Sequence, residues 1–168
     1  DERFSVYVGR SRSNSYVFMY VGSLTSGEQY FLPAGKPSAT WTLIAPRRDN
    51  IEYDADHHGD RFYIRVNDTG RNFRLVSAPV ASPGTASWRE VIPHRPEVML
   101  NGITLFANHM VRSEREGGLP QIVVTDLRSH ASHTLTFPEP VYSAGLSANA
   151  VFATKTLRYA YQSFTTPS

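Results

Sequence analysis

A repeat of strand-like segments is the feature that most restricts how this chain can fold. Four strand-like segments that can be laid over one another recur with starts about 45, 48 and 48 residues apart, within the period range of propeller blades. They span residues 16–21, 61–66, 109–114 and 157–162. Short apolar runs separated by Gly, Asn, Asp, Ser and Pro fill the rest of the chain, and no window keeps the spacing of an amphipathic helix. The sequence therefore predicts an all-β fold.

Each repeat can be divided into four strands. Further strand-like runs follow the first three segments, and another precedes each of the last three. Four strands repeated radially is the plan of a β-propeller, whereas a β-sandwich needs no such period. We predict a partial β-propeller of about three and a half four-stranded blades, since each blade takes about 47 residues. The predicted units are residues 1–48, 49–95, 96–140 and a partial unit, 141–168. Because closed propellers have about four to eight blades, we expect the sequence to be a fragment of a longer chain.

The composition excludes several classes of protein. The 168 residues carry 17 basic and 15 acidic side chains, and the basic ones are scattered rather than clustered, so we expect no nucleic-acid partner. The absence of cysteine excludes disulfides and thiolate zinc sites and is typical of a cytoplasmic protein. No stretch approaches the roughly 20 apolar residues of a membrane helix. We expect no membrane partner and no cofactor.

Several blocks of sequence resemble a known family. They are residues 52–68, 71–76, 93–96, 113–121, 137–143 and 157–163. In this order they are similar to the propeller of the oligopeptidase B branch of the prolyl oligopeptidase family of serine peptidases. They cover nearly the whole chain, and together they are specific although no single block is.

The resemblance implies a function for the longer protein. In this family a seven-bladed propeller caps an α/β-hydrolase domain that carries a Ser, Asp and His triad. Members of this branch are expected to cleave short peptides after Arg or Lys, while the cap keeps folded proteins away from the triad. By this resemblance the chain is roughly the second half of the propeller, and the hydrolase domain is not in it. Its partners would be the hydrolase domain of the same polypeptide and short peptides.

The chain has one near match to the nucleophile elbow of serine hydrolases. That motif needs Gly-x-Ser-x-Gly, because the strained turn leaves no room for side chains beside the serine. The segment Gly9-Arg10-Ser11-Arg12-Ser13 fails at the last position and no helical pattern follows it. We interpret it as a polar turn, and we predict no catalytic residue in this chain.

A cluster of carboxylates and histidines is the richest polar feature. It comprises Glu52, Asp54, Asp56, His57, His58 and Asp60. The spacing lacks a metal-binding pattern such as H-x-x-x-H, so we predict no metal site. We expect a strand that places Glu52, Asp54 and Asp56 on one face, followed by a hairpin turn at residues 57–60. An alternative is a propeller hydrolase that acts through Asp54 and Asp56, and raised carboxylate pKa values would favour it.

Two charged hairpins are candidate contacts with substrate or with another domain. We expect residues 113–118 to end a strand in a charged turn that exposes Glu114, Arg115 and Glu116, and Arg71 and Arg74 to flank another turn. The simpler interpretation is a polar hairpin whose charges pair with one another and contribute under about 1 kcal/mol.

Two kinds of function remain open from the sequence. The favoured hypothesis is a non-catalytic domain that restricts access to a peptidase active site. The alternative is an independent protein-binding propeller, which would use its exposed loops as the contact surface. In either case we expect the blade faces left bare in a partial propeller to be apolar, and hence a possible homodimer of this segment.

Overall fold

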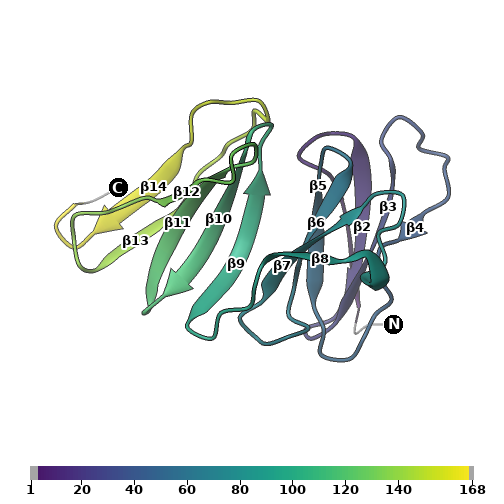
Figure 1. The fold of residues 1–168 in the computed structure, drawn as a ribbon, viewed down its shortest axis with the longest axis horizontal. Coiled ribbons are helices and arrows are strands. Elements are labelled where there is room, and N and C mark those ends of the chain that lie inside the picture. Colours follow the sequence, from purple (N-terminus) through teal and green to yellow (C-terminus); the bar gives the residue numbers. More distant parts are fainter. Residues whose placement is uncertain (1–3, 167–168) are drawn as a thin grey trace. The chain divides into compact units, whose positions relative to one another are not determined.

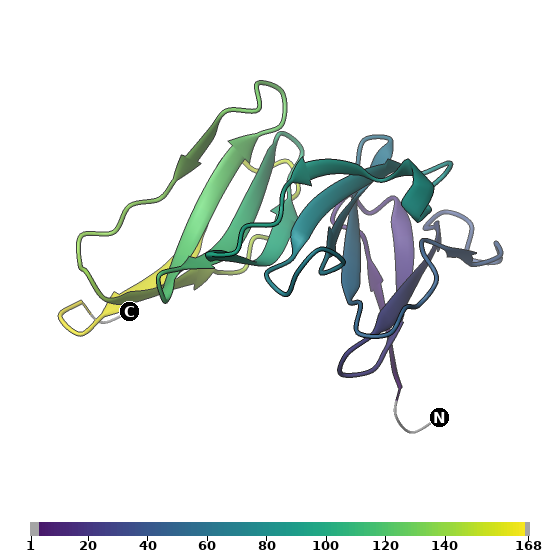
Figure 2. The same ribbon diagram turned by 60° about the horizontal axis from the view of Figure 1, so that its bottom comes forward.

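The computed structural model describes residues 4–166, and the regular structure of these residues is β-sheet apart from one short 3-10 helix (Figure 1). Each sheet is an antiparallel meander of strands that are consecutive in the chain. The first sheet contains β1 (Ser5–Arg10), β2 (Tyr16–Gly22), β3 (Gly27–Pro33) and β4 (Thr42–Leu43). The second contains β5 (Tyr53–His58), β6 (Arg61–Val66), β7 (Arg74–Pro79) and β8 (Arg89–Ile92), with the helix η1 (Thr85–Ser87) between β7 and β8 (Figure 2).

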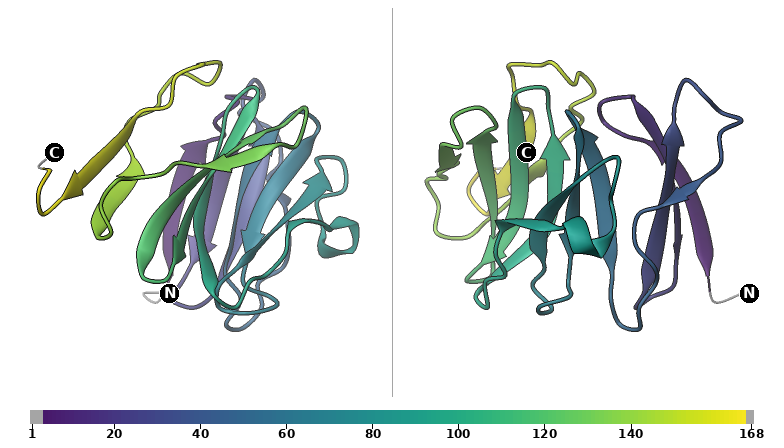
Figure 3. Two further views of the ribbon diagram at one scale, coloured as in Figure 1. Left: turned by 60° about the vertical axis from the view of Figure 1, so that its left-hand side comes forward. Right: turned by 45° about the vertical axis from the view of Figure 1, so that its right-hand side comes forward.

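The third sheet also has four strands, and the last has two. The third contains β9 (Val98–Leu105), β10 (His109–Glu116), β11 (Leu119–Asp126) and β12 (Ser132–Thr134). The last sheet pairs β13 (Tyr142–Leu146) with β14 (Tyr159–Ser163), drawn at the yellow end of the colour scale in Figure 3. The predicted all-β architecture of consecutive four-stranded units is confirmed. The residues group into two compact units, Asp1–His94 and Arg95–Ser168, which we describe separately.

The core of the first unit follows from the alternation of strand side chains. Phe62, Ile64 and Val66 on β6 are fully buried, as their shared face requires. Phe62 lies edge-on to Phe31 and Phe18, with ring centroids 4.7 and 5.6 Å away. These rings join the first and second sheets in one apolar cluster.

Tyr53 supplies a polar anchor inside this core. Its hydroxyl accepts hydrogen bonds from the backbone N–H groups of Gln29 (2.8 Å) and Ala45 (3.1 Å) and donates to the Ala45 carbonyl (2.7 Å). Burial raises the pKa of Tyr53 to about 12. One phenol thereby satisfies three backbone groups that would otherwise be buried without partners.

The second unit has a smaller core. Phe106, Val111 and Ile122 are buried in the third sheet and its flank, and Leu146 and Leu157 pack against them. Beside this cluster the ring of Phe137 stacks on Tyr161 with centroids 4.8 Å apart and planes 11° apart. Aromatic stacking therefore holds the two-stranded sheet to the connection that precedes it.

The meander topology defines one end of every sheet. Four antiparallel strands return to the end at which they started, so the first strand begins and the fourth strand ends at the same end. The β2–β3, β6–β7 and β10–β11 hairpins lie at that end too, as do the start of β13 and the finish of β14. We call it the connection end, because the chain passes from one sheet to the next there.

Two predicted turns are shorter than expected. His57 and His58 are the last residues of β5, where they pair with Phe62 and Arg61, so the predicted turn at 57–60 is reduced to Gly59 and Asp60. Gly59 has a φ of 65°, which lets two residues close the hairpin. Likewise Ser113–Glu116 continue β10, and only Gly117 and Gly118 turn, both at positive φ.

Strand β1 is exposed along its whole length. Val6, Tyr7 and Val8 are 58%, 65% and 65% exposed, whereas Val17 and Met19 on the neighbouring strand are half-buried. The bare apolar surface of the first sheet is thus carried by β1. Among residues 4–166, no helix has the length and apolar character needed to cross a membrane.

Candidate functional site at the connection end

Arginine–carboxylate pairs gather at the connection end of the described sheets. In the first sheet Arg47 lies 3.1 Å from Glu28, donates to the Val21 carbonyl at 3.3 Å, and stacks over the ring of Phe4 at 4.2 Å. In the second sheet Arg65 lies 2.7 Å from Asp54 and stacks over Phe73 at 4.0 Å. These pairs make the connection end a charged surface.

Arg74, at the start of β7, is the centre of the largest network in the first unit. It makes two hydrogen bonds to the Asp68 carboxylate, at 2.8 and 2.9 Å, and a third to Glu90 at 3.3 Å. Arg48 approaches the same Asp68 at 3.8 Å. The hydrogen bond to Asp68 raises the pKa of Arg74 further. Arg74 therefore holds the β6–β7 hairpin in shape.

Arg71 lies in the same hairpin and is exposed to solvent. The backbone beside it is unusual, because Phe73 has a φ of 60°, a left-handed conformation that is rare for a bulky residue. The stacking of Arg65 on Phe73 supports that conformation. Of the two predicted contact residues here, Arg74 is hydrogen-bonded within the hairpin, whereas Arg71 is exposed to solvent.

Glu114 is buried, which corrects the expectation that it lies in an exposed turn. Its carboxylate accepts hydrogen bonds from two guanidinium groups, those of Arg112 (2.9 Å) and Arg95. Arg112 also donates to Thr125 at 3.3 Å, and the Thr125 and Ser132 hydroxyls are 2.7 Å apart. A register shift between Ser113 and Glu114 in the β9–β10 pairing accompanies this inward position.

Arg115 and Glu116 behave as the hairpin prediction requires, since both are exposed at the end of β10. Arg115 donates to the Gly118 carbonyl at 2.8 Å and so closes the turn. The simpler interpretation, in which the hairpin charges pair with one another, is wrong for Glu114, whose partners Arg95 and Arg112 lie outside the turn.

The acidic strand β5 is held by hydrogen bonds. Asp54 is bound by Arg65, and Asp56 accepts from the backbone N–H groups of Arg12 (3.0 Å) and His57 (2.8 Å). Burial raises the pKa of both carboxyls; the Arg65 charge opposes the shift at Asp54, and the two N–H groups oppose it at Asp56. The raised values are those that catalysis by these carboxylates would require, but the structural partners occupy both groups. Among residues 4–166, no group of three His, Cys, Asp or Glu side chains is arranged to hold a metal.

The failed elbow motif folds as a polar turn that contacts β5. The Ser13 hydroxyl lies 2.7 Å from Nδ1 of His57 and 2.9 Å from the hydroxyl of the buried Ser11. His57 is 6% exposed and lies against the ring of Tyr16, with centroids 4.6 Å apart. Burial lowers the pKa of His57, and a hydrogen bond with the backbone of Gly59 opposes that shift.

This Ser–His contact is at the opposite end from the charged network. Sequence reasoning missed it because Ser13 and His57 are 44 positions apart. It also missed Arg95, which meets Glu114 from the chain segment before β9. The polar turn at 11–15 and the acidic strand were both recognised, but nothing in their sequences indicates that they touch.

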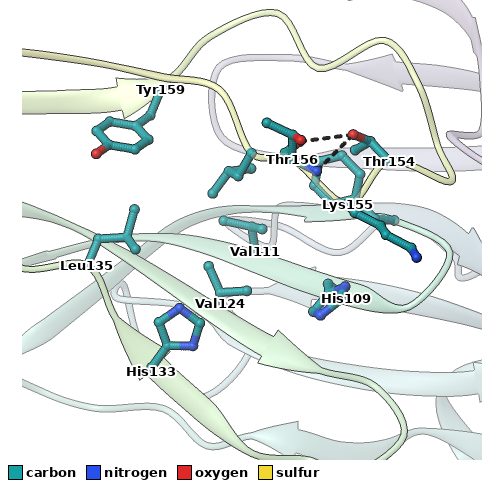
Figure 4. Close-up of a pocket in the computed structure, with 11 residues that line it drawn as sticks. His109, Val111, Val124, His133, Leu135, Thr154, Lys155, Thr156 and Tyr159 are labelled. Carbon is teal, nitrogen blue, oxygen red and sulfur yellow. Dashed lines mark hydrogen bonds between the residues drawn. The ribbon is translucent and has the colours of Figure 1, made fainter.

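The second unit contains a pocket with a volume of about 360 Å³ (Figure 4). Val111, Val124 and Leu135 line its apolar floor, and His109, His133 and Lys155 stand at its margins. The floor is continuous with the apolar cluster of this unit, and His109 pairs with Asp126 at 3.7 Å. None of the predicted site residues lines it. We interpret the pocket as a seam in the packing between neighbouring sheets.

The consecutive four-stranded meanders and the repeat period define a segment of a β-propeller. The profile of the prolyl oligopeptidase N-terminal β-propeller domain matches residues 1–168, so the chain belongs to the prolyl oligopeptidase family. The predicted family is confirmed.

Known proteins share this segment along its whole length. It is 38% identical to dipeptidyl aminopeptidase BI from Pseudoxanthomonas mexicana over 100% of this chain and 23% of the relative. It is 27% identical to Protease 2 from Moraxella lacunata over 99% of this chain and 24% of the relative. The closed form of oligopeptidase B from Trypanosoma brucei, with covalently bound antipain, superposes with a TM-score of 0.91 at 28% identity. That match covers 99% of this chain and 25% of the other. The chain thus spans about a quarter of the length of the relatives it matches.

Proposed function

We propose that this chain is a non-catalytic propeller segment that restricts access to a serine peptidase active site in a hydrolase domain of the same polypeptide. The observation that carries the proposal is the family match over residues 1–168, together with relatives about four times as long. The alternative of an independent binding propeller loses support, because the named relatives are peptidases.

The proposed mechanism is steric. The sheet topology indicates which end of the propeller is joined to the rest of the polypeptide. Any domain joined in sequence to a propeller is joined where blades begin and end, which is the connection end. Arg71 is exposed at this end of the second sheet, and Arg115 and Glu116 are exposed at this end of the third sheet. Each hairpin is suited to polar contacts with a hydrolase domain or a peptide. Glu114 and Arg74 would act indirectly, because each is bound within its own sheet and positions the exposed residues beside it.

For the substrate we propose short peptides cleaved after Arg or Lys. The sequence blocks that resemble the oligopeptidase B branch support it, as does the similarity to Protease 2 and to oligopeptidase B. A second candidate is removal of N-terminal dipeptides, favoured by the 38% identity to dipeptidyl aminopeptidase BI. We also propose that the protein acts in the cytoplasm, on the strength of its lack of cysteine.

A substrate panel on the full-length protein distinguishes the two specificities. Chromogenic peptides with a blocked N-terminus and Arg, Lys or Pro before the scissile bond are compared with dipeptide substrates that have a free N-terminus. We expect the blocked Arg and Lys peptides to be cleaved most efficiently. Preference for the free dipeptides would support the second candidate.

The access function has its own test. One arginine-containing sequence is offered to the full-length protein in a short peptide and in a surface loop of a stable folded protein. We expect rapid cleavage of the peptide and resistance of the folded protein. Equal cleavage of both would contradict the proposed restriction of access.

A further inference from the structure

Two large apolar side chains project almost completely into solvent at equivalent places in the fold. Leu24 is 97% exposed and Phe164 is 95% exposed. Leu24 lies in the hairpin between β2 and β3, the second and third strands of its sheet. Phe164 directly follows β14, the second strand of its sheet. Each therefore lies at the connection end of its own sheet.

The two turns have the same sequence pattern and the same hydrogen bonds. Residues 23–26 read Ser-Leu-Thr-Ser, and residues 163–166 read Ser-Phe-Thr-Thr. In each, the first serine N–H donates to the carbonyl of the fourth residue at 2.8 Å, and the threonine N–H donates back to the serine hydroxyl, at 3.4 and 3.2 Å. The equivalent hairpins of the second and third sheets lack this pattern.

The second turn is further fixed by a carboxylate. Glu139 accepts hydrogen bonds from the hydroxyls of Ser163, Thr165 and Thr166, at 3.1, 3.3 and 2.7 Å. These bonds lower the pKa of Glu139, the largest effect coming from Thr166. The turn that carries Phe164 is thus tied to Glu139 by three hydrogen bonds.

We propose that Leu24 and Phe164 are apolar contacts with the hydrolase domain of the same polypeptide, and that they stabilise the closed arrangement of the two domains. The inference rests on the proposed function. It adds two contact residues and the apolar character of the contact. A fully exposed Leu or Phe gains by burial, so a turn that presents one fits an apolar partner surface. The named relatives are about four times as long as this chain, and the topology joins further polypeptide to the sheets at the connection end, where strands enter and leave each sheet.

The test uses the full-length protein with Leu24→Ser, Phe164→Ser and the double substitution. Val151→Ser is the matched control, because Val151 is 65% exposed but lies in the β13–β14 loop at the opposite end. The readout is the rate at which a protease cuts the connection between the domains, with small-angle X-ray scattering as a second measure of opening. We expect each substitution at the connection end to speed cutting by about tenfold, the factor expected when one large apolar contact is lost, and the control to match the wild type. The melting temperature of the 168-residue chain should not change, since both side chains are exposed.

Cutting rates equal to wild type in all variants would overturn the inference. So would an altered KM for peptides with unchanged opening, which would make the two residues substrate contacts. A lower mass of the self-associated 168-residue chain in light scattering would make them a self-association surface and would also overturn the inference. The proposed function is judged separately by the wild-type protein: if that protein excludes folded substrates while the variants stay closed, only this inference fails.

Discussion

A single carboxylate illustrates how far burial changes the role of a charged residue. Glu114 was expected to form weak pairs in an exposed turn, but it lies between the guanidinium groups of Arg95 and Arg112 at 4% exposure. Removing one partner from a buried ion pair leaves charge without compensation, which costs far more than breaking a surface pair.

Substitution of Glu114 tests this arrangement. We predict that Glu114→Gln lowers the free energy of unfolding of the 168-residue chain by about 3 kcal/mol, because two guanidinium groups then face a neutral amide. Urea denaturation followed by circular dichroism gives the value. Glu116→Gln, two residues away and exposed, is the control and should stay within about 0.5 kcal/mol of the wild type. Similar losses in both variants would contradict the structural role of Glu114.

Among the elements, the turn between β1 and β2 and the strand β5 form a junction within the first unit. Ser13 meets His57, and the Arg12 N–H meets Asp56. Because burial lowers the pKa of His57, the folded state favours its neutral form, which can accept the Ser13 hydrogen bond. The junction is therefore weakened by acid.

The sign of the pH dependence can be worked out. The pKa of His57 is lower in the folded state than the ordinary 6.5, so its contribution is fully present above about pH 6.5 and is lost as the pH falls through the folded pKa. The pKa of Asp56 is raised above its ordinary 3.8, so Asp56 acts in the opposite direction and its contribution is lost as the pH rises through that raised pKa. We predict that the free energy of unfolding falls as the pH is lowered below about 6.5 and that His57→Phe reduces this slope.

Urea denaturation across that pH range provides the measurement. Ser13→Ala should cost about 1 kcal/mol at neutral pH, the usual contribution of one hydrogen bond. His58→Phe is the control, because His58 is the neighbouring residue and its ring packs edge-on to Tyr63, with centroids 6.4 Å apart. An identical slope in the wild type and His57→Phe would show that His57 does not carry the pH dependence.

Comparison of these elements with the sequence shows what could be predicted and why. The bounds of β6 were predicted at 61–66 because its side chains alternate between core and solvent, a local signal. The turn predicted at 57–60 is longer than the observed one. Two histidines resemble turn residues in the sequence, whereas the pairing of His57 with Phe62 makes them part of β5. The pairs Arg95–Glu114 and Ser13–His57 join residues far apart in sequence, and no local pattern carries that information.

At the scale of the whole molecule, the bare surface of β1 has a consequence for assembly. Val6, Tyr7 and Val8 expose apolar surface on a strand that has no neighbour on its outer side among the described residues. Such edges invite pairing with another chain. We therefore predict that the 168-residue chain self-associates at micromolar concentration, and that Tyr7→Lys shifts it toward monomer.

Light scattering at several dilutions measures this assembly. Val151→Lys, at an exposed loop position, is the matched control and should leave the mass unchanged. A wild-type mass equal to the 18.8 kDa of one chain at every concentration would contradict the prediction.

The central proposal is that this chain belongs to a peptidase but does not itself carry the catalytic machinery. Its near match to the elbow motif folds as a turn in which Ser13 binds His57, and the final glycine is replaced by that serine. The most direct measurement is turnover of an arginyl chromogenic peptide by the purified 168-residue chain and by the full-length protein, each with and without a serine-directed inhibitor. The account predicts inhibitor-sensitive turnover by the full-length protein and none by the chain. Inhibitor-sensitive turnover by the chain that is lost in Ser13→Ala would contradict it.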